Sequence, residues 1–445
     1  MLIPYDLKGQ MIGVLGLGRS GVAATATLQA AGAHVFVFDD EKEQQDILEM
    51  TMINWMEWPW HKLSALVISP GIPHHHPTPH PAAAMAYNHN VEVISEVELA
   101  LRSKPKARLI AVTGTNGKST TTALIGHCLK TAGYPVAIGG NLGDPACSLV
   151  DPGKNGVLVL ELSSYQLETT PSLAPSISIL LNISPDHLDR HGGIAGYVAA
   201  KTIVLDRLDE TGIAIIGDGD KHVKTIAKRT VARGIKTLIA SPKLSLIAQK
   251  RSKALAGAHN AENAAAAAMA LQAIGLKDQI ISRGIDSFAS LPHRLQPVAS
   301  CGNVRFINDS KATNGIAAAK ALASFQDIYW VAGGLAKQDG LTPVMPYLGA
   351  VKKAYLIGTS ASAFAKILSG ICPATVCGDL KKATQAAFDD ASTDPKGGTI
   401  LLAPAAASFD QFPDFGARGD TFAALARDLC ATGHDGHNGR RGNHA

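Results

Sequence analysis

The sequence predicts an α/β protein with three domains, and three observations support that fold class. Apolar, β-branched runs repeatedly stop at glycine-rich or polar turns that open directly into helical patterns, which is typical of parallel sheets covered by helices. The length of 445 residues suits about three domains. Two glycine motifs stand at the ends of separate runs, near residues 16 and 114. We expect a Rossmann-like domain over 1–98, a P-loop-type domain with a mostly parallel sheet over 99–291, a second Rossmann-like domain over 292–433 and a disordered tail over 434–445.

The composition describes a globular protein with large buried cores. Apolar residues make up 46% and charged residues 18%, and the net charge of +4 is spread along the chain, with no basic stripe for nucleic acid. The N-terminus has no basic segment followed by an apolar one, and no uncharged apolar run reaches about 18 residues. We therefore expect a cytoplasmic protein with no membrane insertion, no nucleic-acid partner and no required protein partner.

The six cysteines give no sign of a disulfide framework. They are scattered, and no C-x-x-C occurs. We expect all of them to be reduced core residues of a cytosolic enzyme; they stand at positions 128, 147, 301, 372, 377 and 430.

The first glycine motif lies between two predicted strands, over 11–15 and 34–38. It reads Gly16-Leu17-Gly18-Arg19-Ser20-Gly21, opens a helix, and is followed by Asp39-Asp40 at the end of the second strand. In this setting G-x-G-x-x-G alone indicates a dinucleotide site. However, a glycine turn at a helix N-terminus binds any pyrophosphate, and a carboxylate at the next strand end accepts a hydrogen bond from any ribose. A UDP-linked substrate, a dinucleotide and a purely structural turn therefore all remain open.

A later predicted strand, over 65–69, leads into a second turn of interest. The turn reads Ser69-Pro70-Gly71-Ile72-Pro73 and could face the same ligand. Histidines at 74, 75, 76 and 80 then alternate with prolines. A histidine-rich tract can bind metal, but the prolines favour a stiff surface loop.

The second glycine motif predicts a phosphate-binding loop. An apolar run over 109–113 should be a buried strand, and it stops at Gly114-Thr115-Asn116-Gly117 before a helix that begins near Lys118. Backbone N–H groups, the helix N-terminus and the lysine bring positive charge to one point, and the hydroxyl of Ser119 can bind Mg²⁺. The general pattern G-x-x-x-x-G-K-[ST] is only partly met, because Val112 holds the first glycine position. The alternative is a glycine turn with a chance lysine.

Polar side chains follow two further predicted strands of the central domain. Glu161 ends the apolar run over 157–161, and His187 follows the run over 177–181. Strand ends are where α/β sheets place their ligands, so a carboxylate there suits Mg²⁺. Taken alone, Glu161 could be an ordinary exposed glutamate, His187 a structural histidine, and Lys201, on a helix further on, a solvated lysine.

Several segments, in order from Gly16 to Asp420, resemble the Mur ligase family, the ATP-dependent amino-acid ligases of cell-wall precursor synthesis. The phosphate loop T-G-T-N-G-K-S-T is similar to that of the family, as is the segment N-I-S-P-D-H that ends at His187. The run N-D-S-K-A-T-N over 308–314 resembles the D-glutamate-adding members. The resemblance implies a UDP-binding first domain without a redox cofactor, a central ATPase-type domain and a third domain that binds the amino acid.

The resemblance also assigns roles residue by residue. It implies catalytic roles for Lys118, Glu161, His187 and Lys201. It implies a metal site of two Mg²⁺ ions, held by Ser119, Glu161, His187 and Lys201 as a CO₂-derived carbamate. The ATP-binding residues would be Gly114, Thr115, Asn116, Gly117, Lys118, Ser119, Thr120, Thr121, Asn260, Asn263, Arg294 and Asp309. The UDP-substrate residues would be Gly16, Leu17, Gly18, Arg19, Ser20, Asp39, Asp40, Ser69, Gly71 and Asn141. The D-glutamate residues would be Lys311, Thr313, Lys337, Ser408 and Phe415.

The reaction implied is the ATP-dependent addition of D-glutamate to UDP-N-acetylmuramoyl-L-alanine through an acyl phosphate. Without the resemblance, Asn260 would be read as a helix N-cap. Two other classes stay open: another ATP-dependent ligase of the superfamily, such as a folylpolyglutamate synthase or another Mur member, and a nicotinamide-dependent oxidoreductase built on the first domain.

Overall fold

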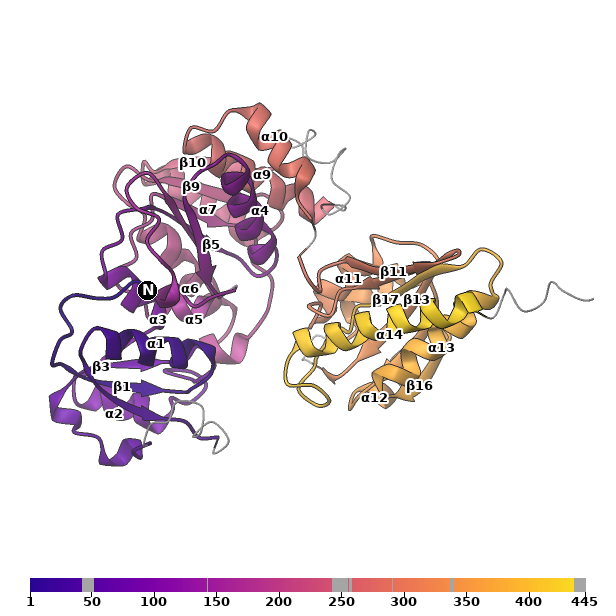
Figure 1. Cartoon of the computed structure of the whole chain (residues 1–445), viewed down its shortest axis with the longest axis horizontal. Coiled ribbons are helices and arrows are strands. Elements are labelled where there is room, and N and C mark those ends of the chain that lie inside the picture. Colours follow the sequence, from indigo (N-terminus) through magenta and orange to yellow (C-terminus); the bar gives the residue numbers. More distant parts are fainter. Residues whose placement is uncertain are drawn as a thin grey trace, which may run out of the picture. The chain divides into compact units, whose positions relative to one another are not determined.

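The protein forms two compact units in the computed structural model. The structure describes residues 1–41, 52–141, 143–241, 255, 258–289, 291–336 and 340–435. Unit 1 comprises Met1–Ser252 with Ala258–Phe288, and unit 2 comprises Lys253–Gly257 with Ala289–Ala445. Unit 1 contains two parallel sheets, and unit 2 contains one mostly parallel sheet and a short two-stranded antiparallel sheet. The described chain therefore has an α/β fold, as predicted (Figure 1).

The first sheet of unit 1 has four parallel strands in the order β2-β1-β3-β4. Apolar side chains alternate between its two faces: Val14 packs toward α1, whereas Leu15 packs toward α2. The two helices lie on opposite faces (Figure 1). The elements are β1 (Met11–Leu15), α1 (Arg19–Ala30), β2 (His34–Phe38), η2 (Trp55–Glu57), η3 (Trp60–Lys62), β3 (Leu63–Ile68), α2 (Pro81–Asn88), β4 (Glu92–Ile94) and α3 (Glu96–Arg102).

The second sheet of unit 1 has six parallel strands in the order β10-β9-β8-β5-β7-β6. α4 packs against α9 and α10, while α6 and α7 pack with β9 on the other face. Its elements are β5 (Arg108–Thr113), α4 (Lys118–Thr131), β6 (Val136–Gly140), η4 (Ala146–Ser148), β7 (Val157–Glu161), α5 (Ser164–Glu168), β8 (Ile177–Leu180), η5 (Leu188–His191), α6 (Ile194–Asp206), β9 (Ile213–Gly217), α7 (Lys221–Ala232), β10 (Lys236–Ala240), α9 (Ala258–Ala273) and α10 (Asp278–Ser287).

The strand order of this sheet determines where its ligand edge lies. β5 lies between β7 and β8, and the register pairs Val112 with Glu161. Since all three strands are parallel, the loops after β5, β7 and β8 leave the sheet at one edge. The connection from β7 to β8 crosses β5, which makes this edge a topological switch point.

The sheet of unit 2 has six strands in the order β11-β12-β17-β13-β15-β16, of which only β11 runs antiparallel to its neighbour. α13 and α14 cover one face, and α11 and α12 cover the other. The elements are β11 (Gln296–Cys301), β12 (Val304–Asn308), α11 (Gly315–Leu322), β13 (Ile328–Gly333), β14 (Leu335–Ala336), η8 (Thr342–Ala350), β15 (Val351–Ile357), α12 (Ala361–Leu368), β16 (Ala374–Gly378), α13 (Leu380–Thr393), β17 (Gly398–Leu402), β18 (Ala406–Ala407) and α14 (Phe415–Asp435).

Some sequence-based boundaries need adjustment. α3 runs across residue 98, and α14 continues through 434 and 435, the first two residues of the predicted tail. Asn260 lies inside α9, so it is not the N-cap of that helix.

The prediction that all cysteines are reduced is wrong for two of them. Cys301, at the end of β11, and Cys430, in α14, form a disulfide across 129 residues of sequence. Their Cα atoms are 5.4 Å apart, within the range that a disulfide spans. Spacing could not reveal the pair, because the two positions meet only when α14 packs against β11. The free cysteines are Cys128, Cys147, Cys372 and Cys377.

This pairing predicts a thiol count. Protein purified without reductant and unfolded in guanidinium should react with Ellman's reagent at four thiols, the free cysteines. After full reduction it should react at all six. Six reactive thiols before reduction would contradict the disulfide.

Glu96 is a buried carboxyl group in unit 1. It is 1% exposed and accepts hydrogen bonds from the Cys147 backbone N–H (3.3 Å) and the Gln166 side-chain amide (3.2 Å). Burial raises the pKa of Glu96 from 4.5 to about 7. As the pH rises from 4.5 to 7, the unfolded state loses this proton before the folded state does, so the free energy of unfolding falls.

We expect Glu96→Gln to reduce this pH dependence, because the amide is neutral throughout. The stability of the variant relative to wild type should rise by about 3 kcal/mol between pH 4.5 and pH 8, as measured by urea unfolding. Glu210→Gln, at an exposed position, is the control and should follow wild type. Parallel pH curves for Glu96→Gln and wild type would contradict the assignment.

Candidate active site

The phosphate loop closes the end of β5 at the switch point. Gly117 is the N-cap of α4 with φ +88°, a conformation that favours glycine. The loop is fixed to the segment after β8: the Thr115 N–H donates to the Asn182 carbonyl (2.8 Å), and the Asn116 N–H donates to the Asn182 side chain (2.9 Å). The loop and the start of its helix therefore form as predicted, with a supporting contact that its sequence does not reveal.

Two lysines meet at this loop. The Nζ atoms of Lys118 and Lys201 both donate to the Gly114 carbonyl, at 2.9 and 2.8 Å. Lys201 is 2% exposed on α6, so the alternative of a solvated lysine is wrong. Burial, followed by the positive charge of Lys118, holds the pKa of Lys201 well below its usual value. Both effects favour the neutral, nucleophilic form of the Lys201 amine over its charged form.

Glu161 lies at the same edge and suits a metal ion. It is 1% exposed, so the alternative of an exposed strand-end glutamate is also wrong. Its Oε1 accepts from the Asn141 side chain (2.8 Å), whereas its buried Oε2 has no hydrogen-bond partner among the described residues. A buried carboxylate oxygen without a partner is costly unless a cation or a water occupies the space beside it.

His187 follows β8 and approaches this edge from the other side of β5. Its backbone is left-handed (φ +52°), and its side chain is 45% exposed, with Nε2 3.7 Å from the Asp186 carboxylate. Among the described residues no three His, Cys, Asp or Glu side chains gather as a metal site. A site here would need oxygen ligands from a nucleotide, from Ser119, or from a modified Lys201. The residues present fit Mg²⁺ on those terms, because oxygen ligands are the ones it prefers.

The candidate adenine residues lie behind the phosphate loop. Asn260 and Asn263 are both buried, and the Asn263 side-chain amide donates to the Asn260 side-chain oxygen (3.1 Å). A Cβ atom on Gly117 would lie 2.1 Å from Asn263 Oδ1. A methyl group at position 117 would therefore displace the Asn263 side chain from its hydrogen bond to Asn260.

The first glycine motif forms a separate turn on the first sheet. Gly16 has φ +87°, and the Leu17 N–H donates to the Asp39 carboxylate. The Ser69 hydroxyl donates to the Gly16 carbonyl (3.0 Å), which brings the second candidate turn against the first. The remaining candidates sit around this edge: Gly18 and Arg19 are exposed at the start of α1, beside Ser20; Asp40 and Gly71 are also exposed.

The first glycine motif is connected to the turn that follows β6 in the second sheet of unit 1. The Arg19 guanidinium donates to the Gly143 carbonyl, in the turn that carries Asn141. Because Asn141 in turn contacts Glu161, the candidate substrate and metal residues form one continuous edge within unit 1.

The candidate amino-acid site lies in unit 2, where β12 ends. Lys311 Nζ lies 3.7 Å from the centroid of the Phe415 ring, and the Ser310 hydroxyl donates to the Phe415 carbonyl (2.8 Å). Asp309 accepts from the Leu295 N–H (3.1 Å), next to Arg294, and burial raises its pKa to about 6. Thr313 follows on the same loop, Ser408 is buried just after β18, and Lys337 lies outside the described residues.

Sequence reasoning missed one residue that organises this site. Arg418, in α14, is 1% exposed, and it donates to the Ser310 hydroxyl and carbonyl (3.0 and 2.9 Å) and to the Ala406 carbonyl (3.2 Å). It therefore holds together the loops that carry Lys311 and Ser408. An arginine three residues after a candidate ligand, Phe415, is the only signal that the sequence contains for it.

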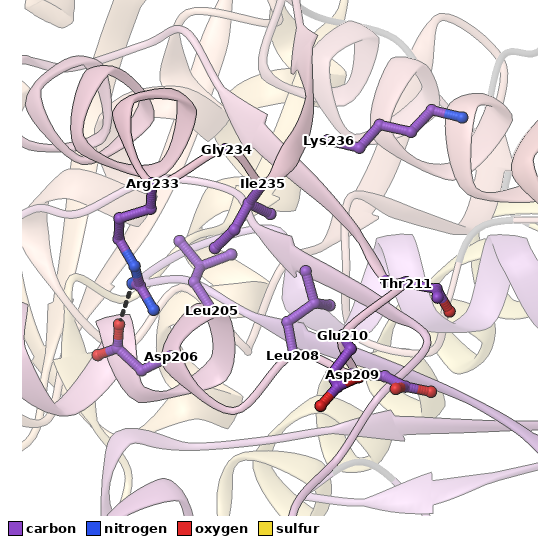
Figure 2. Close-up of a pocket in the computed structure, with 11 residues that line it drawn as sticks. Leu205, Asp206, Leu208, Asp209, Glu210, Thr211, Arg233, Gly234, Ile235 and Lys236 are labelled. Atoms are coloured by element: carbon purple, nitrogen blue, oxygen red, sulfur yellow. Dashed lines mark hydrogen bonds and ion pairs between the residues drawn. The ribbon is translucent and has the colours of Figure 1, made fainter.

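A pocket of about 300 Å³ lies at the opposite edge of the central sheet, where β9 and β10 begin (Figure 2). It is lined by residues 205–206, 208–212 and 233–236, and an ion pair joins Asp206 to Arg233. None of the candidate residues lines it. Ligands of parallel sheets bind at the carboxyl ends of the strands, so we do not assign the active site to this pocket. Among the described helices, none is long and apolar enough to span a membrane.

Comparisons with known proteins agree with the arrangement. Residues 112–271 match the family model described as the Mur ligase middle domain, and residues 293–406 match the model described as the Mur ligase, glutamate ligase domain. A UDP-N-acetylmuramoylalanine--D-glutamate ligase of Rhodospirillum rubrum is 41% identical, with 97% of each chain covered. One of Paramagnetospirillum magneticum is 42% identical, with 95% of this chain and 97% of the relative covered.

The fold is also similar to solved structures. UDP-N-acetylmuramate-alanine ligase of Thermotoga maritima has a TM-score of 0.61 at 17% identity, over 94% of this chain and 99% of that one. MurF ligase of the same organism in complex with ADP has a TM-score of 0.58 at 15% identity, over 97% of each chain. At these identities the likeness concerns the fold alone.

The short distance from an added Cβ at Gly117 to Asn263 predicts that a methyl group at this position weakens nucleotide binding. Gly117→Ala should weaken nucleotide binding about tenfold or more, because overpacking costs about 1–3 kcal/mol and distorts the loop. The measurement is titration with a fluorescent ATP analogue.

Gly133→Ala is the matched control. Gly133 follows the other end of α4, also has a left-handed φ (+77°), and has nothing within 4 Å of an added Cβ. Both variants bear the same backbone strain, but only Gly117→Ala should lose affinity. Equal affinities in the two variants would show that the loop tolerates the methyl group.

Proposed function

The chain belongs to the Mur ligase family, and from this premise we propose that it joins D-glutamate to UDP-N-acetylmuramoyl-L-alanine at the expense of ATP, in the synthesis of peptidoglycan precursors. The observation that carries the proposal is the 41% identity to a D-glutamate ligase over 97% of each chain. Lys311, in the run similar to D-glutamate-adding members, lies over the Phe415 ring in unit 2, and this pair supports the same amino acid. This proposal sets aside the other ligases of the superfamily.

ATP would bind at the switch point of the central sheet. The phosphate loop, residues 114–121, would bind the phosphates through its backbone N–H groups, with Lys118 turning from the Gly114 carbonyl toward the γ-phosphate. Asn260 and Asn263 would bind the adenine. Arg294 and Asp309, from unit 2, would contact the phosphates and the ribose respectively.

Two Mg²⁺ ions would be held by Ser119, Glu161, His187 and the carbamate form of Lys201. When bound, Mg²⁺ neutralises charge on the transferring phosphoryl group and on the acyl oxygen. The buried Glu161 Oε2 without a partner among the described residues supports this assignment.

Lys201 would act as a carbamate. Its neutral amine attacks the carbon of CO₂, a C–N bond forms, and one amine proton is released, leaving a carboxylate on a long side chain. The low pKa of the buried amine favours this reaction, because only the neutral form is nucleophilic. Its position beside the Gly114 carbonyl would place the new oxygens next to the phosphate loop.

The sugar nucleotide would bind to the first sheet. It would contact the residues of its two turns and their neighbours: Gly16, Leu17, Gly18, Arg19, Ser20, Asp39, Asp40, Ser69, Gly71 and Asn141. The described part of this sheet has four strands, whereas the dinucleotide-binding fold is built from two halves with six strands in all. This difference favours UDP over a nicotinamide dinucleotide.

The reaction would proceed in two steps. A carboxylate oxygen of the alanine residue attacks the γ-phosphorus, the bond to ADP breaks, and an acyl phosphate forms. The D-glutamate amine then attacks the acyl carbon, loses a proton and expels inorganic phosphate. D-glutamate would be oriented for this attack by Lys311, Thr313, Lys337, Ser408 and Phe415. A low local dielectric would strengthen the electrostatic attraction between the lysines and the carboxylates of D-glutamate.

The remaining expectations fit this function as proposals. The three domains would span 1–98, 99–291 and 292–433, apart from the boundaries that fall inside α3 and α14. The enzyme would act in the cytoplasm with these three substrates, without nucleic acid and without a required protein partner.

The function predicts selectivity for one amino acid. With ATP, Mg²⁺ and UDP-N-acetylmuramoyl-L-alanine, phosphate release should require D-glutamate and should stay at background with L-glutamate, meso-diaminopimelate or L-lysine. Turnover with one of the other amino acids would move the chain to another member of the family. No turnover with any of them would contradict the ligase function.

The carbamate predicts chemical rescue. Lys201→Ala should lose activity by about 100-fold or more, since it removes a metal ligand, and added acetate or formate should restore part of it. Lys221→Ala, at an exposed position, is the control and should remain active. Activity of Lys201→Ala near that of wild type would contradict the proposed role.

A further inference from the structure

We propose that Arg190 is a positioning residue that fixes the Ser69–Ile72 turn of the first sheet to the His187 loop of the central sheet. The inference rests on the proposed function, in which that turn contacts the sugar nucleotide and His187 binds metal. Arg190 would thereby set the distance between the substrate carboxylate and the phosphate that it attacks.

The guanidinium of Arg190 binds three successive carbonyls of the turn. It donates to Gly71 (2.8 Å) and Ile72 (3.0 Å), with a longer contact to Pro70 (3.4 Å). The donor and acceptors are about 120 positions apart in sequence, so the contact joins two separate sheets of unit 1. The planar fork of arginine can bind adjacent carbonyls at once, whereas lysine offers a single point of charge.

The Tyr165 ring holds this guanidinium in place. The Arg190 Cζ atom lies 4.5 Å from the ring centroid, a cation–π distance. The same ring contacts His187 edge-on (5.7 Å) and stacks on His191 (5.2 Å, with 7° between the planes). One aromatic side chain thus contacts three members of the loop that carries the candidate metal ligand.

A second set of contacts reinforces the same junction. The Glu168 carboxylate lies 3.3 Å from His191 Nδ1 and 3.7 Å from His74 Nε2. His74 is 7% exposed, so the prediction that this histidine-rich segment is a stiff surface loop is wrong at this residue. His76 lies against Gly192, where an added Cβ would meet its ring at 3.2 Å. The histidine-rich segment therefore acts as a docking segment between the two sheets.

The junction also continues toward the phosphate loop. His191 packs against Tyr197 (5.3 Å between ring centroids), and the Tyr197 hydroxyl lies 3.1 Å from the Thr115 hydroxyl. Lys201 Nζ lies 4.7 Å from the Tyr197 ring. These contacts anchor the His187 loop to the central sheet, and the phosphate loop has its own bonds to Asn182. Loss of Arg190 would therefore release the Ser69–Ile72 turn and leave the phosphate loop in place.

The test compares the Michaelis constants of the three substrates. In Arg190→Met the KM for UDP-N-acetylmuramoyl-L-alanine should rise about tenfold, with a fall in kcat, because charged hydrogen bonds to the turn are lost. The KM values for ATP and D-glutamate should change less than about twofold. Arg190→Lys should show a smaller effect in the same direction. Arg229→Met, at an exposed position on α7, is the control and should match wild type.

A pair of Tyr165 variants separates the positioning role from a purely structural one. Tyr165→Phe keeps the ring face and should behave as wild type, whereas Tyr165→Leu should raise the same KM as Arg190→Met. If Arg190→Met proves insoluble, the Arg190→Lys and Tyr165→Leu pair decides the question. An unchanged KM for the sugar nucleotide in these variants, or an equal rise in all three KM values, would overturn the proposal. Because wild type is assayed alongside, its failure to use D-glutamate would overturn the proposed function separately.

Discussion

The Gly114 carbonyl accepts hydrogen bonds from Lys118 and Lys201, and the chemistry of the site depends on this shared acceptor. Two ammonium groups side by side in a buried position each disfavour the other's charge. Lys118 starts α4 and is partly exposed, whereas Lys201 is buried on α6, so burial and the charge of Lys118 lower the pKa of Lys201. In the proposed function, the neutral form of this amine would be converted into a carbamate anion, which would balance Lys118 and serve as a metal ligand.

The parallel order of the strands places the two lysines beside the other candidate residues. β5, β7 and β8 end at one edge and present the phosphate loop, Glu161 and the His187 loop to the same space. Arg190 fixes the Ser69–Ile72 turn of the first sheet to that edge, within the same compact unit. The amino-acid residues belong to unit 2, where Arg418 fastens their loops.

Local patterns in the sequence predicted the parts of this fold that depend on neighbours in the chain. Strands 11–15 and 157–161 have the predicted limits, and the helix after the phosphate loop begins at Lys118, because apolar periodicity and a glycine turn are local signals. Contacts between distant positions could not be predicted. The Cys301–Cys430 disulfide, the burial of His74 and the bonds of Arg190 and Arg418 exist only after separate elements have packed.

The measurement that tests the account most directly follows oxygen from the substrate into phosphate. UDP-N-acetylmuramoyl-L-alanine labelled with ¹⁸O in the alanine carboxylate is turned over with ATP and D-glutamate, and the inorganic phosphate is analysed by mass spectrometry. If the carboxylate attacks the γ-phosphorus at the Lys118 edge, the bridging oxygen leaves with the phosphate, so each phosphate molecule should carry one ¹⁸O atom. Unlabelled phosphate, with product formed, would contradict an acyl phosphate and with it the proposed mechanism.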